Sequence, residues 1–371
     1  MKHNIIFILL DGSRWDRLDK SDEFMSLKKE GLLFNNITAA YPYTFAAINA
    51  IFTGFFGKEN GVNAYYKMFK LKDSIPTIPE ILKNNGYFTA CDLITDKVIS
   101  KRGFDVHQCH NEHKDDLSIY HPKLIKEVFK KANKKPVFMF LQFSKIHLAT
   151  VTKILKKYEW DNKEFYKLKE NNLERYDKAF VKAGKYALEI KKTIEDLEQR
   201  EKTILIFFTD HGTGIGERFG ERNYGVYTFE ETIRTFYLFM GPKIKKSYIS
   251  DKLFSSIDLF PTILELCEIT NNFNTDGKSF AKYVKGDRNA KMGRTHVFSE
   301  TGGLQGPYPS PKEPNVFCVK TKRFKLMYFK TPRKWKLFDL KKDPQEKNNL
   351  IGIGIKEEVK MKKILQNWIE R

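Results

Sequence analysis

Two apolar runs in the sequence each end directly in side chains that can bind a divalent cation. Ile5–Leu10 runs into Asp11, and Thr203–Thr209 runs into Asp210 and His211. Continuous apolar runs of this length predict buried parallel strands. Because ligands gather outside the carboxyl ends of the strands in such sheets, we expect Asp11, Asp210 and His211 to converge on one cation. A set with mixed oxygen and nitrogen donors favours manganese or zinc, with calcium or magnesium as the alternatives.

The segment Tyr41–Gly54 offers a hydroxyl as a fourth ligand. Thr44 lies just before a predicted helix over Ala46–Phe52, and the amino terminus of that helix would stabilise an anionic oxygen or a bound phosphate. Coordination by a metal is one of the few ways to activate a threonine hydroxyl as a nucleophile. A lone threonine in this position is more often a helix cap, so both interpretations remain at this point.

Strands and helices alternate over most of the chain. Further strands are predicted at Leu32–Ile37, Tyr87–Ile94, Pro136–Phe143 and Arg234–Met240. Further helices are predicted at Ser21–Glu30, Thr77–Asn85, Asn172–Arg200 and Ser256–Cys267. This alternation predicts an α/β fold with a mostly parallel sheet and helices on both of its faces.

The end of the chain has a different pattern. Short strands are predicted at Val316–Val319, Phe324–Phe329 and Trp335–Leu340, and a helix runs from about Lys356 to Arg371. We therefore expect a catalytic α/β domain over residues 1–290. A small C-terminal antiparallel subdomain over residues 291–371 packs against it.

The composition favours an anionic partner. The chain has 371 residues, with 66 Lys+Arg against 46 Asp+Glu and a formal net charge of +20. That excess suits an anionic substrate, nucleic acid or an anionic membrane surface, although scattered lysines are also typical of a solvated surface. Since no recognition motif supports a nucleic-acid binder, we expect no specific nucleic-acid partner and keep peripheral membrane contact as an alternative.

Two features of the sequence bear on the cellular compartment, and they agree. The apolar stretch after Met1 is too short for a signal peptide and Asp11 interrupts it, and no run reaches transmembrane length. The four cysteines are widely spaced and predict free thiols in a reducing compartment. The sequence therefore predicts a soluble cytoplasmic protein.

Seven motif-like segments follow one another along the whole chain. They are Asp11–Asp16, Thr44–Gly54, Tyr176–Asp177, Thr209–Gly212 with Gly216–Glu217, Phe229–Arg234, Ile257–Leu264 and Leu337–Leu350. In this order they resemble the sulfatase branch of the alkaline phosphatase superfamily. The resemblance runs nearly end to end and implies an alkaline-phosphatase-like fold.

The departures from that family pattern concern the chemistry. Sulfate-cleaving members usually carry C-x-P-x-R or S-x-P-x-R, whose Cys or Ser matures to formylglycine. Thr44 occupies that position, cannot mature in this way, and is followed by neither the proline nor the arginine. Gly12 replaces the usual second aspartate, which argues against a four-oxygen calcium site. The remaining set resembles the single-metal threonine site of lipoteichoic acid synthases and phosphoethanolamine transferases: Asp11, Thr44, Asp210 and His211.

The resemblance implies a metal-dependent hydrolase or transferase that acts on phosphate or sulfate esters through Thr44 and a covalent intermediate. The substrate would be anionic, and a glycan-linked or lipid-linked ester is among the alternatives. His147 matches the family histidine that reaches the leaving group and is a candidate general acid. Candidate charge clamps for the transferring group are Arg14, Lys145 and Arg218, with Arg222 and Asn223 as further candidates.

Two alternatives remain. The lost proline, arginine and second aspartate are also compatible with a catalytically silent, sulfatase-like binding protein. A hydrolase and a transferase share the first half-reaction, so the sequence does not separate them.

A histidine-rich stretch has spacing that resembles a metal motif only loosely. It contains His107, Cys109, His110, His113 and His121. Without a helix or strand period to support it, we interpret it as a polar surface loop. His296 is the only late histidine, so we expect one metal ion and not two.

Overall fold

A nine-stranded sheet lies at the centre of the computed structural model, which describes residues 2–150, 154–270, 272–287 and 292–371. The strands are β1 (Asn4–Leu10), β2 (Leu32–Thr38), β3 (Phe88–Leu93), β4 (Val106–Cys109), β5 (Val137–Phe143), β6 (Thr203–Phe208), β7 (Arg234–Met240), β8 (Tyr248–Ser250) and β9 (Phe254–Ser255). Their order is β4-β3-β5-β1-β6-β7-β2-β8, with β9 also paired to β2. Only β7 runs antiparallel to its neighbours β6 and β2, so the predicted mostly parallel sheet is confirmed.

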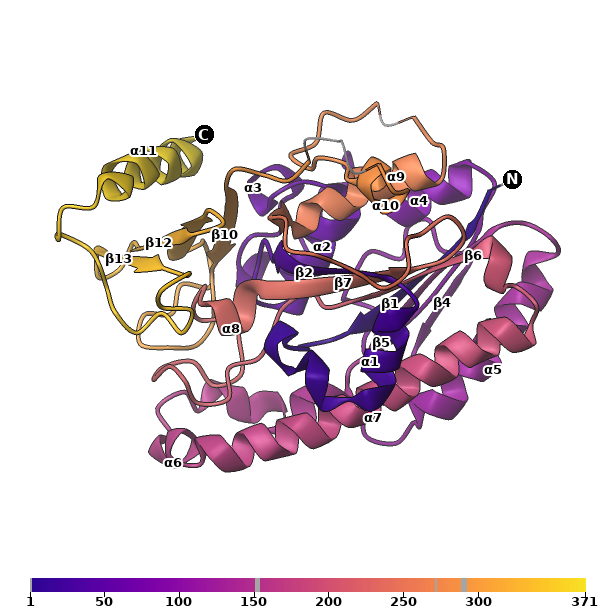
Figure 1. Ribbon diagram of the computed structural model, residues 1–371, viewed down its shortest axis with the longest axis horizontal. Coiled ribbons are helices and arrows are strands. Elements are labelled where there is room, and N and C mark those ends of the chain that lie inside the picture. Colours follow the sequence, from indigo (N-terminus) through magenta and orange to yellow (C-terminus); the bar gives the residue numbers. More distant parts are fainter. Residues whose placement is uncertain (1, 151–153, 271, 288–291) are drawn as a thin grey trace.

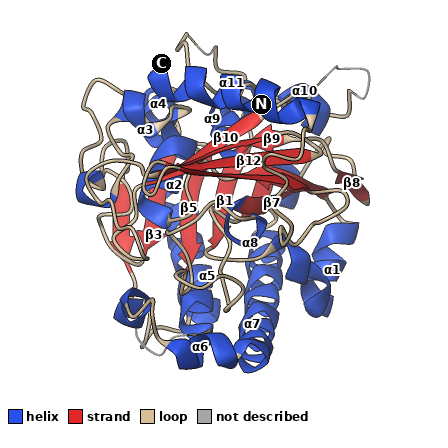
Figure 2. Ribbon diagram, turned by 90° about the vertical axis from the view of Figure 1, so that its left-hand side faces the viewer, coloured by secondary structure: helices blue, strands red, loops and turns tan. Residues whose placement is uncertain are grey.

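Helices cover both faces of this sheet, as Figures 1 and 2 show. One face carries α2 (Thr44–Thr53), α4 (Ile78–Asn84), α9 (Leu259–Leu266) and α10 (Ala281–Val284). The other carries α1 (Asp22–Lys29), α5 (Leu117–Ala132) and α7 (Lys169–Asp196). Strand β1 shows why both layers of helices are needed, because Phe7 packs toward α2 and Ile8 packs toward α7. Side chains alternate along a strand, so a strand that is apolar throughout must be covered on both sides.

Short helices connect these elements. They are α3 (Gly57–Asn60), α6 (Lys163–Lys167), α8 (Glu230–Ile233) and the 3₁₀ turns η1 (Trp15–Lys20), η2 (Tyr65–Lys67), η3 (Lys145–Ala149), η4 (Ile154–Tyr158), η5 (Arg200–Lys202) and η6 (Ser256–Asp258). Within the described ranges, none of the helices combines the length and the apolar character needed to cross a membrane.

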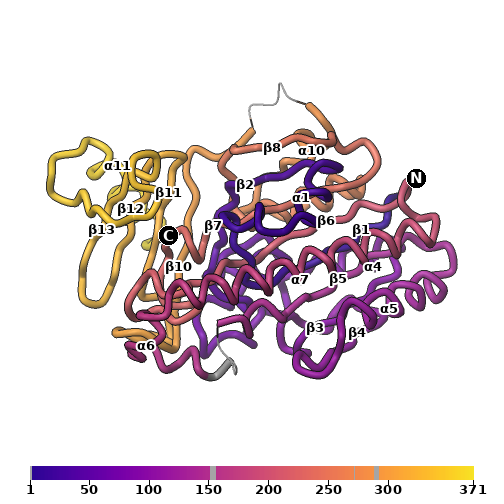
Figure 3. Tube along the Cα trace, turned by 60° about the horizontal axis from the view of Figure 1, so that its bottom comes forward, coloured from indigo at the N-terminus to yellow at the C-terminus, as the bar shows by residue number. Residues whose placement is uncertain are grey.

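A second, antiparallel sheet forms the C-terminal part. Its strands are β10 (Val297–Thr301), β11 (Val316–Lys320), β12 (Phe324–Phe329) and β13 (Lys334–Asp339). Helix α11 (Lys356–Glu370) packs Met361 and Leu365 against it, and Figure 3 shows this unit at one end of the main sheet. The predicted small antiparallel sheet and final helix are confirmed, with β10 added. The predicted domain boundary at residue 290 falls outside the described residues.

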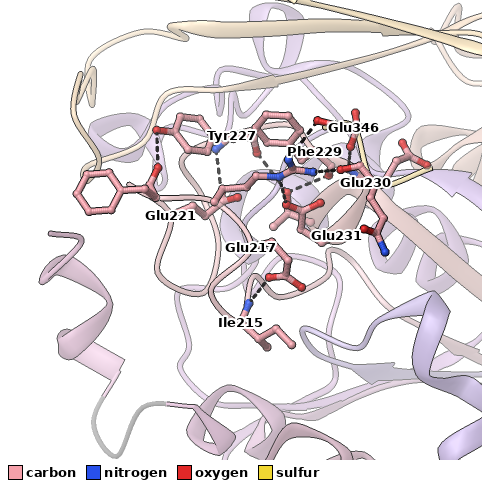
Figure 4. Close-up of polar contacts among 12 residues, drawn as sticks. Ile215, Glu217, Glu221, Tyr227, Phe229, Glu230, Glu231 and Glu346 are labelled. Carbon is pink, nitrogen blue, oxygen red and sulfur yellow. Dashed lines mark hydrogen bonds and ion pairs between the residues drawn. The ribbon is translucent and has the colours of Figure 1, made fainter. Parts of the chain in front are cut away.

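Buried charges join the two sheets. Lys325 Nζ lies 2.5 Å from Glu346 and 3.3 Å from Glu230 Oε1, and Lys320 Nζ lies 2.8 Å from Glu230 Oε2. Figure 4 shows Glu230 beside Glu346, whose Oε2 accepts a hydrogen bond from the Glu230 backbone N–H. Burial opposes ionisation, but the two lysines lower the pKa of Glu230 to about 2. Removing Lys325 would leave the Glu346 carboxylate without its buried lysine, which is strongly destabilising.

The prediction of a surface loop for the histidine-rich stretch is wrong. His110 and His121 are 4% and 0% exposed, and His121 belongs to α5, a helix that the sequence interpretation missed. Only Cys109 and His113 are exposed, while His107 is half-buried in β4. The stretch folds inward because α5 packs an apolar stripe against the sheet and α7.

Candidate active site

The carboxyl ends of β1, β5 and β6 lie side by side. β1 pairs in parallel with both neighbours, so that Leu10 lies opposite Phe143 and Leu9 opposite Phe208. The residue that follows β1 is therefore held next to those that follow β5 and β6, and the Asp11 backbone N–H donates to the Phe143 carbonyl. This register brings together five side chains that are spread over two hundred residues of the sequence. We name them the Thr44 group: Asp11, Thr44, His147, Asp210 and His211.

Thr44 points into this group. Its Oγ1 lies 3.3 Å from Asp11 Oδ1 and 3.2 Å from His211 Nε2. Helix α2 begins at Thr44 itself, two residues earlier than predicted, and ends at Gly54 in the left-handed conformation. The hydroxyl therefore sits at a helix amino terminus, where unpaired backbone N–H groups stabilise negative charge. At 7% exposure, it is close to the surface of the site and not sealed in the core.

The tautomer of His211 suits a metal ligand. Its Nδ1 lies 2.7 Å from the Gly212 carbonyl oxygen, a contact that requires Nδ1 to carry the proton. Nε2 then presents a lone pair toward Asp11 Oδ1 at 3.5 Å and Asp210 Oδ2 at 3.6 Å. Burial lowers the pKa of His211 to about 4, so the ring stays neutral.

Asp11, Asp210 and this lone pair face one another, with His147 beside Asp11. Asp210 Oδ2 is buried and has no hydrogen-bond partner among the described residues. Burial, together with the charge on Asp11, raises the pKa of Asp210 well above its usual value. Ligand atoms of Asp11, His147 and His211 lie within 4.8 Å of one another, close enough to share one ion. The residues present therefore fit a divalent cation, which would relieve the repulsion between the carboxylates.

His147 lies beside Asp11 on the turn η3. Its Nε2 is 2.8 Å from Asp11 Oδ1, and its ring stacks almost parallel to that of His211. Burial by itself lowers the pKa of His147, but the Asp11 carboxylate outweighs it and the net shift is upward. A protonated imidazole here has a proton to donate to a departing oxygen.

Three further residues surround the group and were missed from the sequence. Gln142 donates to Asp11 Oδ2 at 2.6 Å. The Tyr224 ring packs on His211 with centroids 4.3 Å apart, and Lys157 Nζ lies 4.2 Å from the Tyr224 centroid. Burial lowers the pKa of Lys157 to about 8. Gln142 was recognisable as the polar residue near the end of an apolar strand, whereas nothing distinguishes Lys157 from the other lysines of this basic chain.

The turn after Asp11 explains the missing second aspartate. Gly12 has φ +72°, and a Cβ there would lie 2.8 Å from Thr213 Oγ1 and 3.1 Å from the His147 ring. The Tyr176 hydroxyl fixes the same turn, accepting from the Arg14 backbone N–H and donating to the Gly12 carbonyl oxygen. His147 and Thr213 thus occupy the space that a larger side chain at Gly12 would need.

The predicted charge clamps lie around the Thr44 group and do not contact it. Arg14 binds Asp16 at 2.8 Å and Glu217 at 2.5 Å. Arg218 binds Glu231 at 2.8 Å, on the side of the C-terminal sheet. Figure 4 shows Glu231 together with Glu217, which accepts from the Ile215 backbone N–H. The role of these arginines in substrate binding remains a prediction.

The remaining candidates have partners of their own. Arg222 pairs with Glu159 at 2.9 Å, and Asn223 accepts from Thr150 at 2.7 Å. His296 contacts Phe298 and belongs to neither of the two potential metal-ligand groups of the described residues.

Lys145 lines a cavity of about 780 Å³ next to the turn that carries His147. Leu148 and Ala149 of the same turn line it too, whereas Thr44 does not. The walls are rich in cations: Lys114, Lys145, Arg175, Lys178, Lys182 and Lys185. The cavity therefore offers a positively charged space beside the site and not a binding pocket around the threonine itself.

Comparison with known proteins gives a consistent match. The family model "Sulfatase" matches residues 3–269, and the model "N-sulphoglucosamine sulphohydrolase, C-terminal" matches residues 222–371. The N-acetylglucosamine-6-O-sulfatase of Bacteroides thetaiotaomicron is 26% identical over 184 residues, which are 48% of this chain and 31% of that protein. The chain thus spans about a third of the length of this curated relative.

Solved structures agree on the fold. A 2-O GAG sulfatase aligns over 100% of this chain and 92% of its own, with TM-score 0.84 and 17% identity. The phosphonate monoester hydrolase of Agrobacterium radiobacter aligns over 100% of this chain and 95% of its own, with TM-score 0.74 and 15% identity. At these identities the likeness shows the fold alone.

Proposed function

This chain belongs to the sulfatase family, and from that membership and the geometry of the Thr44 group we propose that it is a metal-dependent enzyme of sulfate or phosphate ester bonds, with Thr44 as its nucleophile. The observation that carries the proposal is the position of Thr44 Oγ1, 3.3 Å from Asp11 and 3.2 Å from His211 at the start of α2. A silent binding protein would not need a hydroxyl held between potential metal ligands.

Asp11, Asp210 and His211 would hold the cation, with Thr44 as a further ligand. A bound divalent cation lowers the pKa of a coordinated hydroxyl and neutralises charge on the substrate's oxygens. Gln142 orients Asp11 by donating to Oδ2, so that Oδ1 is left to face Thr44 and His147. The mixed nitrogen and oxygen donors favour manganese or zinc.

The proposed reaction has two steps. In the first, Thr44 Oγ1 forms a bond to the phosphorus or sulfur, the bond to the leaving oxygen breaks, and His147 protonates that oxygen. The Thr44 proton passes to a neighbouring base or to solvent. In the second, water or an acceptor hydroxyl attacks the same atom and gives up its proton to the now neutral His147, the bond to Thr44 Oγ1 breaks, and this oxygen regains a proton from the same base or from solvent.

The substrate is proposed to be anionic and larger than its reacting group. The cation-lined cavity beside η3 would attract and orient such a molecule. By its name, the Bacteroides relative acts on an N-acetylglucosamine 6-O-sulfate, and the Agrobacterium structure is of a phosphonate monoester hydrolase. A glycan- or lipid-linked ester and both sulfur and phosphorus chemistry therefore belong in the first substrate panel.

The test is turnover of 4-nitrophenyl sulfate, 4-nitrophenyl phosphate and bis(4-nitrophenyl) phosphate by matched variants. Thr44→Ala should lose at least about a thousandfold in kcat with every active ester, and Thr44→Ser should retain measurable turnover. Thr53→Ala is the control, because this threonine lies in the same helix and its recorded bonds are to Asn49, Phe55 and Asn60, none of them in the Thr44 group. Unchanged turnover by Thr44→Ala would refute the proposal.

Adding an alcohol acceptor separates the two outcomes of the second step. A transferase should form the acceptor ester at the expense of free sulfate or phosphate. A hydrolase should release the free anion whatever the acceptor concentration.

A further inference from the structure

A second group of carboxylate and imidazoles lies buried away from Thr44. We name it the Asp92 group: Asp92 near the end of β3, His110 just after β4, and His121 on α5. Their exposures are 0%, 4% and 0%. Thr44 enters its group from α2 on one face of the sheet, whereas α5 lies on the opposite face. The Asp92 group is therefore a separate site, and the reaction proposed for Thr44 does not use it.

Both imidazoles converge on one carboxylate oxygen. His110 Nδ1 lies 2.6 Å and His121 Nε2 lies 2.8 Å from Asp92 Oδ2. The three ligand atoms lie within 4.8 Å of one another. The other oxygen, Asp92 Oδ1, is buried and has no hydrogen-bond partner among the described residues. Two imidazole nitrogens and the two oxygens of Asp92 are therefore available as donors to a cation, and Asp92 Oδ1 has no other recorded role among the described residues.

The outer nitrogen of each histidine is also fixed. His110 Nε2 lies 3.0 Å from the Ser144 hydroxyl, and His121 Nδ1 lies 2.6 Å from the Tyr186 hydroxyl. Ligating histidines in metalloproteins usually donate their second N–H to such a partner, which fixes both the tautomer and the ring orientation. Both hydroxyls can accept from these outer nitrogens, so that each inner nitrogen, which faces Asp92 Oδ2, can give up its proton when a cation binds.

We propose that Asp92, His110 and His121 form a second metal site that holds zinc. Two imidazoles and a carboxylate are ligands that zinc takes in proteins, and because all three side chains are buried, we expect the ion to stabilise the fold. This ion would fasten β3, β4 and α5 to one another. Through Ser144 it would also steady the start of η3, the turn that carries His147.

The experiment is metal analysis of the full chain in a background where the Thr44 group can no longer bind an ion. Asp11→Asn with His211→Gln supplies that background. After purification, addition of zinc chloride and exhaustive dialysis, one zinc per folded chain should remain. Adding His110→Gln should reduce it to none. Adding His113→Gln, an exposed histidine of the same stretch, should leave it unchanged.

A second measurement protects the test from misfolding of a variant. X-ray absorption at the zinc edge of the background protein needs no change in the Asp92 group, and it should report nitrogen and oxygen ligands with imidazole scattering. Folded background protein that holds no zinc would overturn the proposal and leave a hydrogen-bonded network in its place. If His110→Gln left the zinc content unchanged, the proposal would also be overturned, because the ion would be bound elsewhere.

Discussion

The Thr44 group and the Asp92 group are built from the same side-chain types but differ in what faces their centres. In the Thr44 group a hydroxyl and two aspartates face inward, and Thr44 is 7% exposed. In the Asp92 group one aspartate faces two histidines, and the hydroxyls of Ser144 and Tyr186 lie on the outside. If the roles proposed for the two groups are right, the placement of the hydroxyl, and not the presence of histidine and aspartate, distinguishes the reactive site from the structural one.

The largest effect should come from the centre of the Thr44 group. Asp11→Asn keeps the shape of the side chain but removes the charge that faces Thr44, His147 and His211. We expect kcat to fall by at least about a thousandfold and the metal at this group to be lost. Zinc at the Asp92 group should remain. Simultaneous loss of both metals would show that the two groups are not independent.

The next effect concerns the Asp92 group. In the Asp11→Asn and His211→Gln background, His110→Gln should lower the melting temperature and make it insensitive to a chelator, whereas the background protein itself should lose stability when chelated. In the otherwise wild-type protein, His110→Gln should lower activity only about tenfold, since His147 is reached indirectly through Ser144 and η3. A loss as large as that of Asp11→Asn would place His110 in the catalytic machinery and break the comparison.

A smaller effect should follow from the partner that orients Asp11. Gln142→Met removes the 2.6 Å hydrogen bond to Asp11 Oδ2 at nearly constant volume. We expect about a tenfold loss in metal affinity or turnover, measured by titrating the metal-free protein with manganese and following activity. Gln199→Met is the control, because Gln199 bonds Asn4 and Leu197 at the opposite end of β1 and β6. Equal losses in both variants would mean that Gln142 has no specific role in orienting Asp11.

The smallest effect on activity should come from a residue outside both groups, where the change is a pH dependence of stability that does not involve metal. Burial raises the pKa of Glu300, the acceptor of the Tyr41 hydroxyl, from 4.5 to about 7. The folded protein then holds a proton that the unfolded chain releases. This contribution to stability is therefore complete below about pH 4 and is lost as pH rises through 7, an effect of up to about 3 kcal/mol.

Denaturant unfolding between about pH 4 and pH 8, with chelator present, measures this slope. Glu300→Gln keeps an acceptor for Tyr41 but cannot titrate, so it should flatten part of the slope. An unchanged slope would mean that other buried carboxyls, such as Glu346, account for it.

Much of the architecture was predictable because apolar runs and helix caps are local. The run before Asp11 forms β1, and Ser21 caps α1 as its position suggested. The convergence of Asp11, Thr44, Asp210 and His211 also followed from strand ends and motif order. Their joint position agrees with the expectation, while the roles assigned to them remain proposals.

The rest depended on contacts that no local pattern encodes. His110 and His121 are buried because α5 packs against the sheet and α7, although Pro122 interrupts the expected signature of that helix. Arg14 and Arg218 looked free to bind substrate, yet each has a carboxylate within 2.8 Å. Lys157 gains its altered pKa only from tertiary burial.

The most direct measurement is mass spectrometry of protein quenched in acid during turnover of the best 4-nitrophenyl ester, followed by proteolysis and fragmentation. His147→Gln should be examined beside the wild-type protein, because it slows the second step and lets the intermediate accumulate. The expected result is one phosphoryl or sulfuryl group on Thr44, absent from Thr44→Ala. Sustained turnover with Thr44 unmodified in both proteins, or the group on another residue, would contradict nucleophilic attack by this threonine.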